Sequence, residues 1–490
     1  MGYKHGAYGE ITDSRATTTT QSDSVSAYIG TAPINLIRGY ADLNLINTPI
    51  KISNMSEAQG TLGYSNDWGS FTLCEVFGQH FDNSVGNIGP IYVVNVLDPD
   101  THKAEEKVTE ELSFNSKRAE FSSSNIILDT FAIADMAEGV DYALEYNFAK
   151  GTAVVKLLKD DVESPVQCSY YVVDKTLVTE EDIIGQATES GEYHGLHAMK
   201  LLYQYHNAIP NILAAPGWSH FPAVYKAMVS IVQKLNGHWD GFVNADIPLK
   251  DKDGNLIDTR AKALEWKAAN GYNSEFSKVY WPQIKDGSGR VFHLSGVGQA
   301  TMQRVDLSHN AIPFESPSNK EIMATCQYFG EGSKNKGFDQ QAANNLNENG
   351  ITTACFWGGK WVLWGPHTAA FKYGADNDGR AIFDANIRML MYITNDFQQT
   401  HGTEIDSPMI PQDKDAILNQ EREKLEMLAS LGALIGTPTV DFVEAANPVS
   451  DMVNGDFVWD VSATPTPPFK SATARVCYTD EGFQSFFGIE

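Results

Sequence analysis

Residues 209–249 read IPNILAAPGWSHFPAVYKAMVSIVQKLNGHWDGFVNADIPL. The segment starts with a short apolar run that ends at Pro216-Gly217, continues with an amphipathic stretch up to Gly237, and ends with a second apolar run from 239 to 249. Short apolar runs between turn residues are typical of buried strands, and a glycine after periodic apolar residues marks the end of a helix. A strand, a helix and a strand in this order favour parallel pairing of the two strands. The segment therefore predicts one unit of a doubly wound, largely parallel α/β sheet.

The same alternation extends along much of the chain. Residues 90–97 (PIYVVNVL) form an apolar run between Gly-Pro and Asp-Pro dipeptides, which predicts a buried central strand. The segments 278–284 and 291–300 continue the strand pattern. We therefore expect an α/β core domain built from residues 28–100 and 181–365.

Two further regions differ in pattern from this core. Residues 101–180 contain VDYALEYNFAKGTAVVKLL, in which two segments of alternating polarity flank Lys150-Gly151. This pattern predicts a β-hairpin within an all-β insertion domain. Residues 366–464 contain two long helical patterns, at 379–400 and 411–436, followed by two strand-like segments, which predicts an α+β C-terminal domain.

The two ends of the chain resemble neither region. Residues 1–27 hold few large apolar side chains and a run from Thr17 to Thr20, so they cannot form a core of their own. Residues 465–490 include and follow a proline-rich segment (PTPPF) that is typical of a hinge. We expect both ends to be extended arms. For residues 1–27, composition leaves open whether the arm is a disordered tail or pairs with another sheet edge.

The composition is that of a folded, water-soluble protein with several domains. The chain has 490 residues, of which 42% are hydrophobic and 20% charged, so it is too long for one compact core and too apolar for a disordered chain. The net charge of −26 repels phosphate backbones, so we expect no contact with nucleic acid. No apolar run reaches transmembrane length and the N-terminus lacks the layout of a signal peptide, so we expect synthesis in the cytoplasm. The five cysteines include no CxxC pair, which predicts free thiols.

Isolated features hint at metal binding, but none completes a site. His194 and His197 lie three residues apart, with His206 further on, yet no HExxH-type carboxylate accompanies them. Residues 251–255 (DKDGN) start like a calcium loop but lack the later ligands, and the acidic loop 374–379 is more typical of a solvated turn. We therefore predict no metal site and no cofactor.

No catalytic constellation emerges either. Ser219 and Ser295 lie near glycines after strand-like segments, but neither fits the GxSxG pattern of hydrolases. Gly296 and Gly298 do not complete a GxGxxG loop, which disfavours nucleotide binding. We predict no catalytic residue, and this favours a structural role.

A series of short motifs is distributed over nearly the whole chain. The series comprises GAYGE (6–10), IGTAP (29–33), NTPI (47–50), GPIYVVNVL (89–97), GVDYALEYN (139–147), EDIIG (181–185), IPNILAAPGW (209–218), VYWPQI (279–284), SPSNK (316–320), NNLNENGITT (344–353) and WVLWGPHTAA (361–370). In this order the motifs resemble the contractile tail sheath proteins of phage tails, phage-tail-like bacteriocins and related contractile injection systems. Each motif alone is weak, but their number and order make the resemblance specific.

The resemblance implies a structural subunit that is not an enzyme. Sheath subunits polymerise with themselves as stacked six-fold rings around an inner tail tube protein, and they contract without nucleotide hydrolysis to drive the tube through a cell envelope. The further partners it implies are baseplate and tail terminator proteins, with no membrane insertion by the sheath itself. It also implies that the β-rich insertion faces outwards, that the C-terminal domain faces the tube, and that the protein is part of a virion tail or a released contractile particle.

The resemblance further implies that both terminal arms add strands to sheets of neighbouring subunits. The candidate contact residues are Tyr8, Glu10 and Ile11 in the N-terminal arm and Val476 and Tyr478 in the C-terminal arm. The family defines its tube-facing residues by position rather than by a motif. For this role we predict a helix between Asp413 and Leu431, whose exposed face is expected to carry Asp415, Glu421, Arg422, Lys424 and Glu426.

Two other functions compete with this interpretation. The first is an α/β hydrolase with a β insertion that would use Ser219 or Ser295. The second is a static tube or capsid protein that assembles but never contracts. The absence of a hydrolase motif and the spread of sheath-like motifs favour the contractile sheath.

Overall fold

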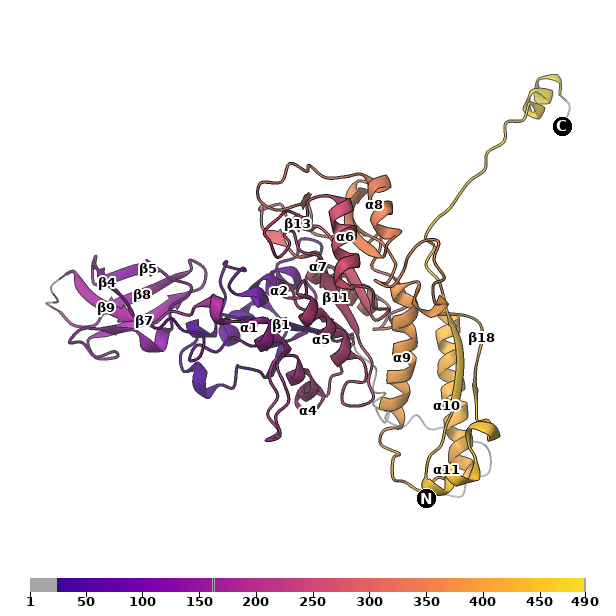
Figure 1. Ribbon diagram of the computed structural model, residues 1–490, viewed down its shortest axis with the longest axis horizontal. Coiled ribbons are helices and arrows are strands. Elements are labelled where there is room, and N and C mark those ends of the chain that lie inside the picture. Colours follow the sequence, from indigo (N-terminus) through magenta and orange to yellow (C-terminus); the bar gives the residue numbers. More distant parts are fainter. Residues whose placement is uncertain (1–23, 161, 163, 489–490) are drawn as a thin grey trace, which may run out of the picture.

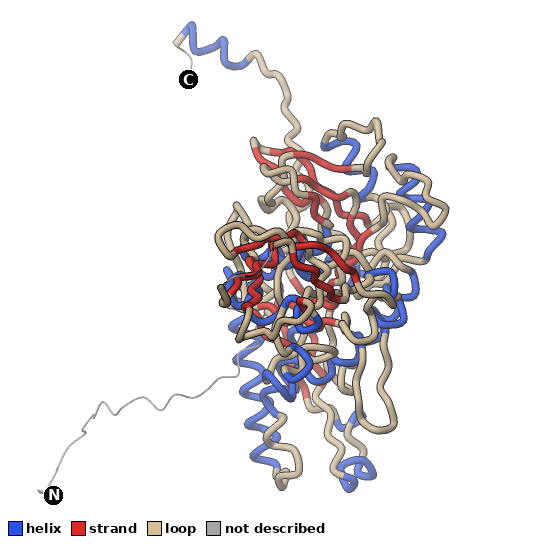
Figure 2. Tube along the Cα trace, turned by 90° about the vertical axis from the view of Figure 1, so that its left-hand side faces the viewer, coloured by secondary structure: helices blue, strands red, loops and turns tan. Residues whose placement is uncertain are grey.

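A computed structural model of the chain describes residues 24–160, 162 and 164–488. The molecule is elongated, with a β-rich lobe at one end, a large sheet in the middle and a pair of long helices at the other end (Figure 1). Figure 2 shows the C-terminal residues extending away from the body of the molecule. Among the described residues, no helix is both long enough and apolar enough to cross a membrane.

The central sheet has eight strands and is mostly parallel. In spatial order the strands are β17 (Lys360–Trp364), β16 (Ile351–Trp357), β12 (Ser277–Tyr280), β11 (Phe242–Asp246), β10 (Ile212–Ala214), β1 (Ser26–Gly30), β3 (Ile91–Asn95) and β2 (Pro49–Ile52). The two edge strands pair antiparallel with their neighbours, and all other pairs are parallel. β10 and β11 pair in register from Ile212 with Phe242 to Ala214 with Asn244. The parallel pairing predicted for residues 209–249 is therefore confirmed.

Helices cover both faces of this sheet. The described helices are α1 (Met55–Leu62), α2 (Thr72–Phe81), α3 (Glu180–Ile184), α4 (Leu202–His206), α5 (Pro222–Val232), α6 (Arg260–Asn270), α7 (Leu294–Ser308), α8 (Gln340–Asn347), α9 (Asp384–His401), α10 (Pro411–Ser430) and α11 (Val449–Asn454). On β12, the Ser277 hydroxyl lies 2.7 Å from that of Tyr225 in α5. Tyr280 lies on the opposite face of the strand, where a Cβ at Gly298 of α7 would approach its ring to 2.6 Å. Glycine at 298 thus permits the close packing of α7 on the sheet.

One predicted strand is wrong. Residues 291–300 form only the two-residue strand β14 (Val291–Phe292) before α7 begins at Leu294. Leu294, Val297 and Ala300 are buried and lie three residues apart, which is the spacing of a helix face. The glycines between these residues weaken helix propensity, but tertiary packing overrides that preference.

The β-rich lobe consists of two three-stranded sheets. One contains β4 (Val108–Leu112), β9 (Val166–Tyr170) and β6 (Ala132–Ile133), and the other β5 (Arg118–Ser122), β8 (Thr152–Leu157) and β7 (Tyr142–Asn147). The hairpin predicted around Lys150-Gly151 is confirmed, because β7 and β8 pair up to Asn147 and Thr152. Phe131, Tyr170 and their neighbours form a hydrophobic cluster within this lobe. A third small sheet, of β14, β13 (Gln283–Lys285) and β15 (Cys326–Tyr328), adjoins the central sheet.

The N-terminal arm is shorter than the sequence suggests. The predicted boundary at residue 27 is wrong, because Ser26 and Ala27 already pair with Ile212 and Leu213 in the central sheet. Ser24 and Val25 are also buried. The polar composition before Tyr28 hid this strand, which pairs on one side with β10 and on the other with β3.

Candidate assembly interface

The two serines that a hydrolase would use lie in the protein interior. Ser219 and Ser295 have no exposed surface, and both hydroxyls donate to the Asp246 carboxylate at the end of β11. Asp246 also accepts the Ser295 backbone N–H over 2.9 Å, so it caps the first turn of α7. Burial raises the pKa of Asp246. These contacts give both serines a structural role, because Ser295 joins the start of α7 to β11 and Ser219 joins the loop between β10 and α5 to β11.

The candidate metal ligands have unrelated partners. His194 Nδ1 lies 3.2 Å from Asn47 Nδ2, and His206 Nε2 lies 2.9 Å from the Pro49 carbonyl oxygen. Burial lowers the pKa of His197. Within the described ranges, no group of three or more His, Cys, Asp or Glu residues is placed to hold a metal ion.

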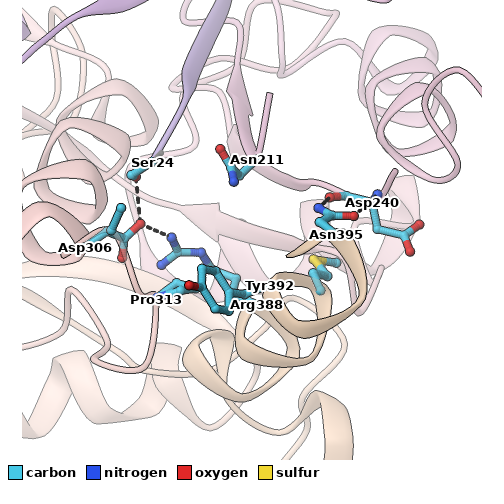
Figure 3. A pocket seen from close by; sticks show the side chains of 10 residues that line it. Ser24, Asn211, Asp240, Asp306, Pro313, Arg388, Tyr392 and Asn395 are labelled. Carbon is cyan, nitrogen blue, oxygen red and sulfur yellow. Dashed lines mark hydrogen bonds and ion pairs between the residues drawn. The ribbon is translucent and has the colours of Figure 1, made fainter. Parts of the chain in front are cut away.

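A buried ion pair joins the N-terminal strand, α7 and α9. The Arg388 guanidinium contacts the Asp306 carboxylate, and the two side chains are only 4% and 2% exposed. Ser24, the first described residue, donates to the same carboxylate over 2.9 Å (Figure 3). Burial raises the pKa of Asp306, while Arg388 opposes this shift. The root of the N-terminal arm is therefore tied to the helix that leads into the C-terminal region.

A cavity of about 20 Å³ borders this ion pair and is lined also by Asn211, Tyr392 and Asn395 (Figure 3). Asp306 Oδ1 and Arg388 Nη1 have no hydrogen-bond partner among the described residues. A polar cavity of this size accommodates one water molecule and is too small for an organic substrate.

A second buried pair fixes the start of α9. Lys278 Nζ and Asp384 Oδ2 lie 2.6 Å apart, and both side chains are fully buried. Lys278 also donates to the Gly365 carbonyl over 2.6 Å, and Ser316 donates to Asp384 over 3.1 Å. Burial lowers the pKa of Lys278, while Asp384 opposes this shift. Because a charge buried this deeply is costly without its partner, the pair holds α9 to the central sheet.

The end of α9 is joined to the middle of α10 by a histidine between two carboxylates. His401 Nδ1 lies 3.0 Å from Glu404 Oε2, and His401 Nε2 lies 2.8 Å from Glu421 Oε1. Both ring nitrogens can donate at the same time only when the imidazole is protonated. Burial lowers the pKa of His401, but the hydrogen bonds to Glu421 and Glu404 outweigh it and raise the pKa above its usual value. A protonated His401 therefore fits this position.

The exposed face predicted for α10 needs correction at two residues. Glu421 is only 4% exposed and points towards α9, where it contacts His401. It also pairs with Lys424, three residues further along α10. Lys424 is also turned inwards, because its Nζ lies 2.8 Å from Asp396 of α9. The other three candidates, Asp415, Arg422 and Glu426, are exposed as expected. The outer face of α10 therefore carries one cation and two carboxylates from the predicted set.

Beside α10 lies a small sheet with free edges. β18 (Leu434–Asp441) and β19 (Asp460–Pro465) pair antiparallel, with an irregularity between Ile435 and Thr439. Within the part of the chain that the structure describes, no third strand pairs with either of them. Each strand thus keeps one row of backbone donors and acceptors available to another chain.

Of the residues predicted to form the arms, the structure describes those in the C-terminal arm. Val476 and Tyr478 are 93% and 80% exposed and lie in a segment without regular secondary structure. Tyr8, Glu10 and Ile11 lie outside the described residues. Val476 and Tyr478 therefore do not pack against the core.

Solved structures of contractile particles share the fold described above. A chain in the six-fold symmetrised baseplate of the anti-feeding prophage aligns with a TM-score of 0.54 at 13% identity, over 98% of this chain and 100% of that chain. A chain in the contracted sheath complex of PVC, an extracellular contractile injection system, aligns with a TM-score of 0.53 at 12% identity, over the same shares. At these identities the likeness shows the fold alone. The fold is a mixed α/β fold with several sheets, as in these particles.

The amino-acid sequence is also similar to that of a phage tail sheath protein. The tail sheath protein of Burkholderia phage BcepMu is 26% identical over 491 aligned positions, which cover 94% of this chain and 96% of that protein. No family model matches the chain. The resemblance to contractile tail sheath proteins is confirmed by this similarity, which spans nearly the whole chain.

Proposed function

We propose that the chain is the structural subunit of a contractile tail sheath, without enzymatic activity. The observation that carries this proposal is the similarity to a phage tail sheath protein over 94% of the chain. The likeness to a chain in a contracted sheath complex supports contraction over a static tube. In this role the protein polymerises as stacked six-fold rings around an inner tube and contracts to drive the tube through a cell envelope.

Each part of the subunit has its own proposed role. The central sheet, from residues 24–100 and 181–365, is the core, and the β-rich lobe of residues 101–180 forms the outer surface. Residues 366–464 face the tube. The two ends of the chain, residues 1–23 and 465–490, link neighbouring subunits. The buried pairs at Asp306 and Lys278 support this scheme, because they make the core and α9 move together.

The β18–β19 sheet is the proposed acceptor for the arms. An extended arm that adds a strand to a free edge gains main-chain hydrogen bonds, and its alternate side chains set the register. The two unpaired edges of this sheet offer room for two arms. The extended and exposed segment around Val476 and Tyr478 is a suitable donor.

The outer face of α10 is the proposed contact with the tube. From the predicted set, this face exposes the cation Arg422 and the carboxylates Asp415 and Glu426. Exposed charges give specificity and orientation rather than much affinity, which suits a contact that is repeated along a tail and must release on contraction. Glu421 and Lys424 act indirectly, by holding α10 against α9.

The remaining partners follow from the proposed role. They are baseplate and tail terminator proteins at the ends of the sheath. Association with a baseplate is supported by the structural likeness to a chain in the baseplate of the anti-feeding prophage. We propose synthesis in the bacterial cytoplasm and incorporation into a virion tail or a released particle. Electron microscopy of negatively stained, purified protein tests the proposal. We expect hollow, striated cylinders, whereas particles of one small size with esterase turnover would support a hydrolase instead.

A further inference from the structure

An open groove lies where the start of α6 meets α8 (Figure 1). Its volume is about 690 Å³, which is within the range of sites for small organic ligands. Within the described ranges, the side chains of Gln341, Asn345 and Glu348 in this groove have no hydrogen-bond or ion-pair partner. The groove therefore offers amide and carboxylate groups that are free to bind a ligand. Its polar lining consists of Arg260, Asp339, Gln341, Asn344, Asn345 and Glu348.

A pair of tryptophans borders this groove. β16 and β17 are joined by the two-residue turn Gly358-Gly359, in which both residues have the positive φ that a tight hairpin requires. Trp357 and Trp364 lie on the same face of this hairpin, with ring centroids 5.6 Å apart. The Trp364 indole N–H donates to Asn344 Oδ1 over 2.8 Å, which places the pair directly beside the groove. Trp357, at the end of the hairpin, is 46% exposed.

A third aromatic ring lies near the same groove. Tyr373 is 72% exposed, and its backbone N–H donates to the Glu348 carbonyl oxygen over 2.7 Å. Exposed rings beside unpaired amides and carboxylates match the chemistry of a sugar. The C–H face of a sugar ring packs on an aromatic ring, and its hydroxyls exchange hydrogen bonds with amide and carboxylate groups.

Charge narrows the class of sugar. The groove contains the carboxylates of Asp339 and Glu348 and the single cation Arg260. The whole chain has a net charge of −26. An anionic polysaccharide would be repelled by this field, whereas a neutral one would not.

We propose that the groove between α6 and α8 binds a neutral oligosaccharide. Trp357 stacks on one sugar ring, and the side chains of Asn345 and Glu348 bind the hydroxyls of the chain. Trp364 is a positioning residue, because its ring supports Trp357 and its N–H holds Asn344. The site is independent of the proposed sheath role, since its residues lie outside both arms and outside α10.

Isothermal titration calorimetry of the full-length protein with cellohexaose, maltohexaose and chitohexaose tests this site. These neutral hexasaccharides differ in linkage and in their N-acetyl groups. We expect at least one of them to bind with a Kd of about 1 mM or lower. Trp357→Ala and Glu348→Ala should each weaken this binding about tenfold, through loss of stacking and of hydrogen bonds.

The matched control is Phe356→Ala. It removes a ring that is 57% exposed from the opposite face of the same hairpin, so it should change the Kd less than about twofold. Circular dichroism checks that each variant is folded. Failure of all three sugars to bind would overturn the proposal, as would equal losses in Trp357→Ala and Phe356→Ala.

Sedimentation of the same proteins tests a second copy of the chain as the other occupant of this surface. We expect Trp357→Ala to polymerise at the wild-type concentration. If Trp357→Ala instead polymerises poorly and no sugar binds, the tryptophan pair is a contact between copies and the sugar site is wrong. A wild-type protein that binds a sugar but stays monomeric at every concentration would contradict the proposed function and support the sugar site.

Discussion

The buried pair between Asp306 and Arg388 allows a quantitative test of how α9 is held to the core. We expect Arg388→Met to lower the free energy of unfolding by about 3–5 kcal/mol, because it leaves the Asp306 carboxylate buried without its cation. The matched control is Arg380→Met. Arg380 pairs with Asp378 at the surface, where the side chains are 59% and 46% exposed, so its loss is expected to cost less than about 1 kcal/mol.

A double variant separates the ion pair from simple loss of packing. Replacing both partners, as Arg388→Met with Asp306→Leu, removes both charges and leaves apolar side chains in the same space. Such replacements of buried pairs are often neutral or stabilising. Ser24 loses its acceptor in this variant, at a cost of about 1 kcal/mol. We therefore expect the double variant to be more stable than Arg388→Met alone.

The assay is urea unfolding below the polymerisation concentration, followed by hydrogen exchange of peptides from α9. This readout reports the stability of the affected region rather than an average over the whole chain. Equal losses for Arg388→Met and Arg380→Met would show that the buried pair does not hold α9 to the core. A double variant no more stable than Arg388→Met alone would show that the unpaired Asp306 carboxylate is not the source of the loss.

Three further predictions concern other parts of the protein. The pKa of His401 is raised in the folded state, so its contribution to stability is fully present below the unfolded pKa of about 6.5 and is lost as the pH rises through the folded pKa. Hydrogen exchange of α10 between pH 6 and 9 should therefore show a loss of protection. This loss should be absent in His401→Gln. Arg422→Glu should weaken attachment of the sheath to the tube without changing thermal stability. Lys424→Glu should instead lower the melting temperature, because Lys424 is paired with Asp396 of α9. Binding to purified tube protein and melting curves distinguish the two outcomes. Ser219→Ala and Ser295→Ala should leave polymers visible by electron microscopy, apart from packing losses of about 1–3 kcal/mol in unfolding, since the hydroxyls serve only Asp246.

Local patterns in the sequence predicted the strands of the central sheet well. The runs around Ile212 and Phe242 are apolar, short and bounded by turn residues, so their period and length point to one structure. Residues 294–300 were misjudged because Gly296 and Gly298 interrupt the helical period. Their role is visible only when α2 and β12 are packed against α7. The helical structure of these residues in α7 therefore depends on tertiary packing rather than on local preference.

The burial of Glu421 could have been predicted, and the ion pair at Asp306 could not. Glu421 lies four residues after Ile417 and four before Leu425, both of which are buried, so helical spacing places it on the apolar stripe. Asp306 and Arg388 are 82 residues apart, and nothing in either neighbourhood identifies the other as its partner. Contacts of this kind depend on how the elements are arranged in space.

The proposed role as a contractile sheath subunit is best tested by helical reconstruction, with cryo-electron microscopy, of the polymer that the purified protein forms. We expect stacked six-fold rings in which terminal segments of one subunit pair with the β18–β19 sheet of another. Smooth tubes without six-fold rings, or a polymer in which both edges of that sheet stay unpaired, would contradict it.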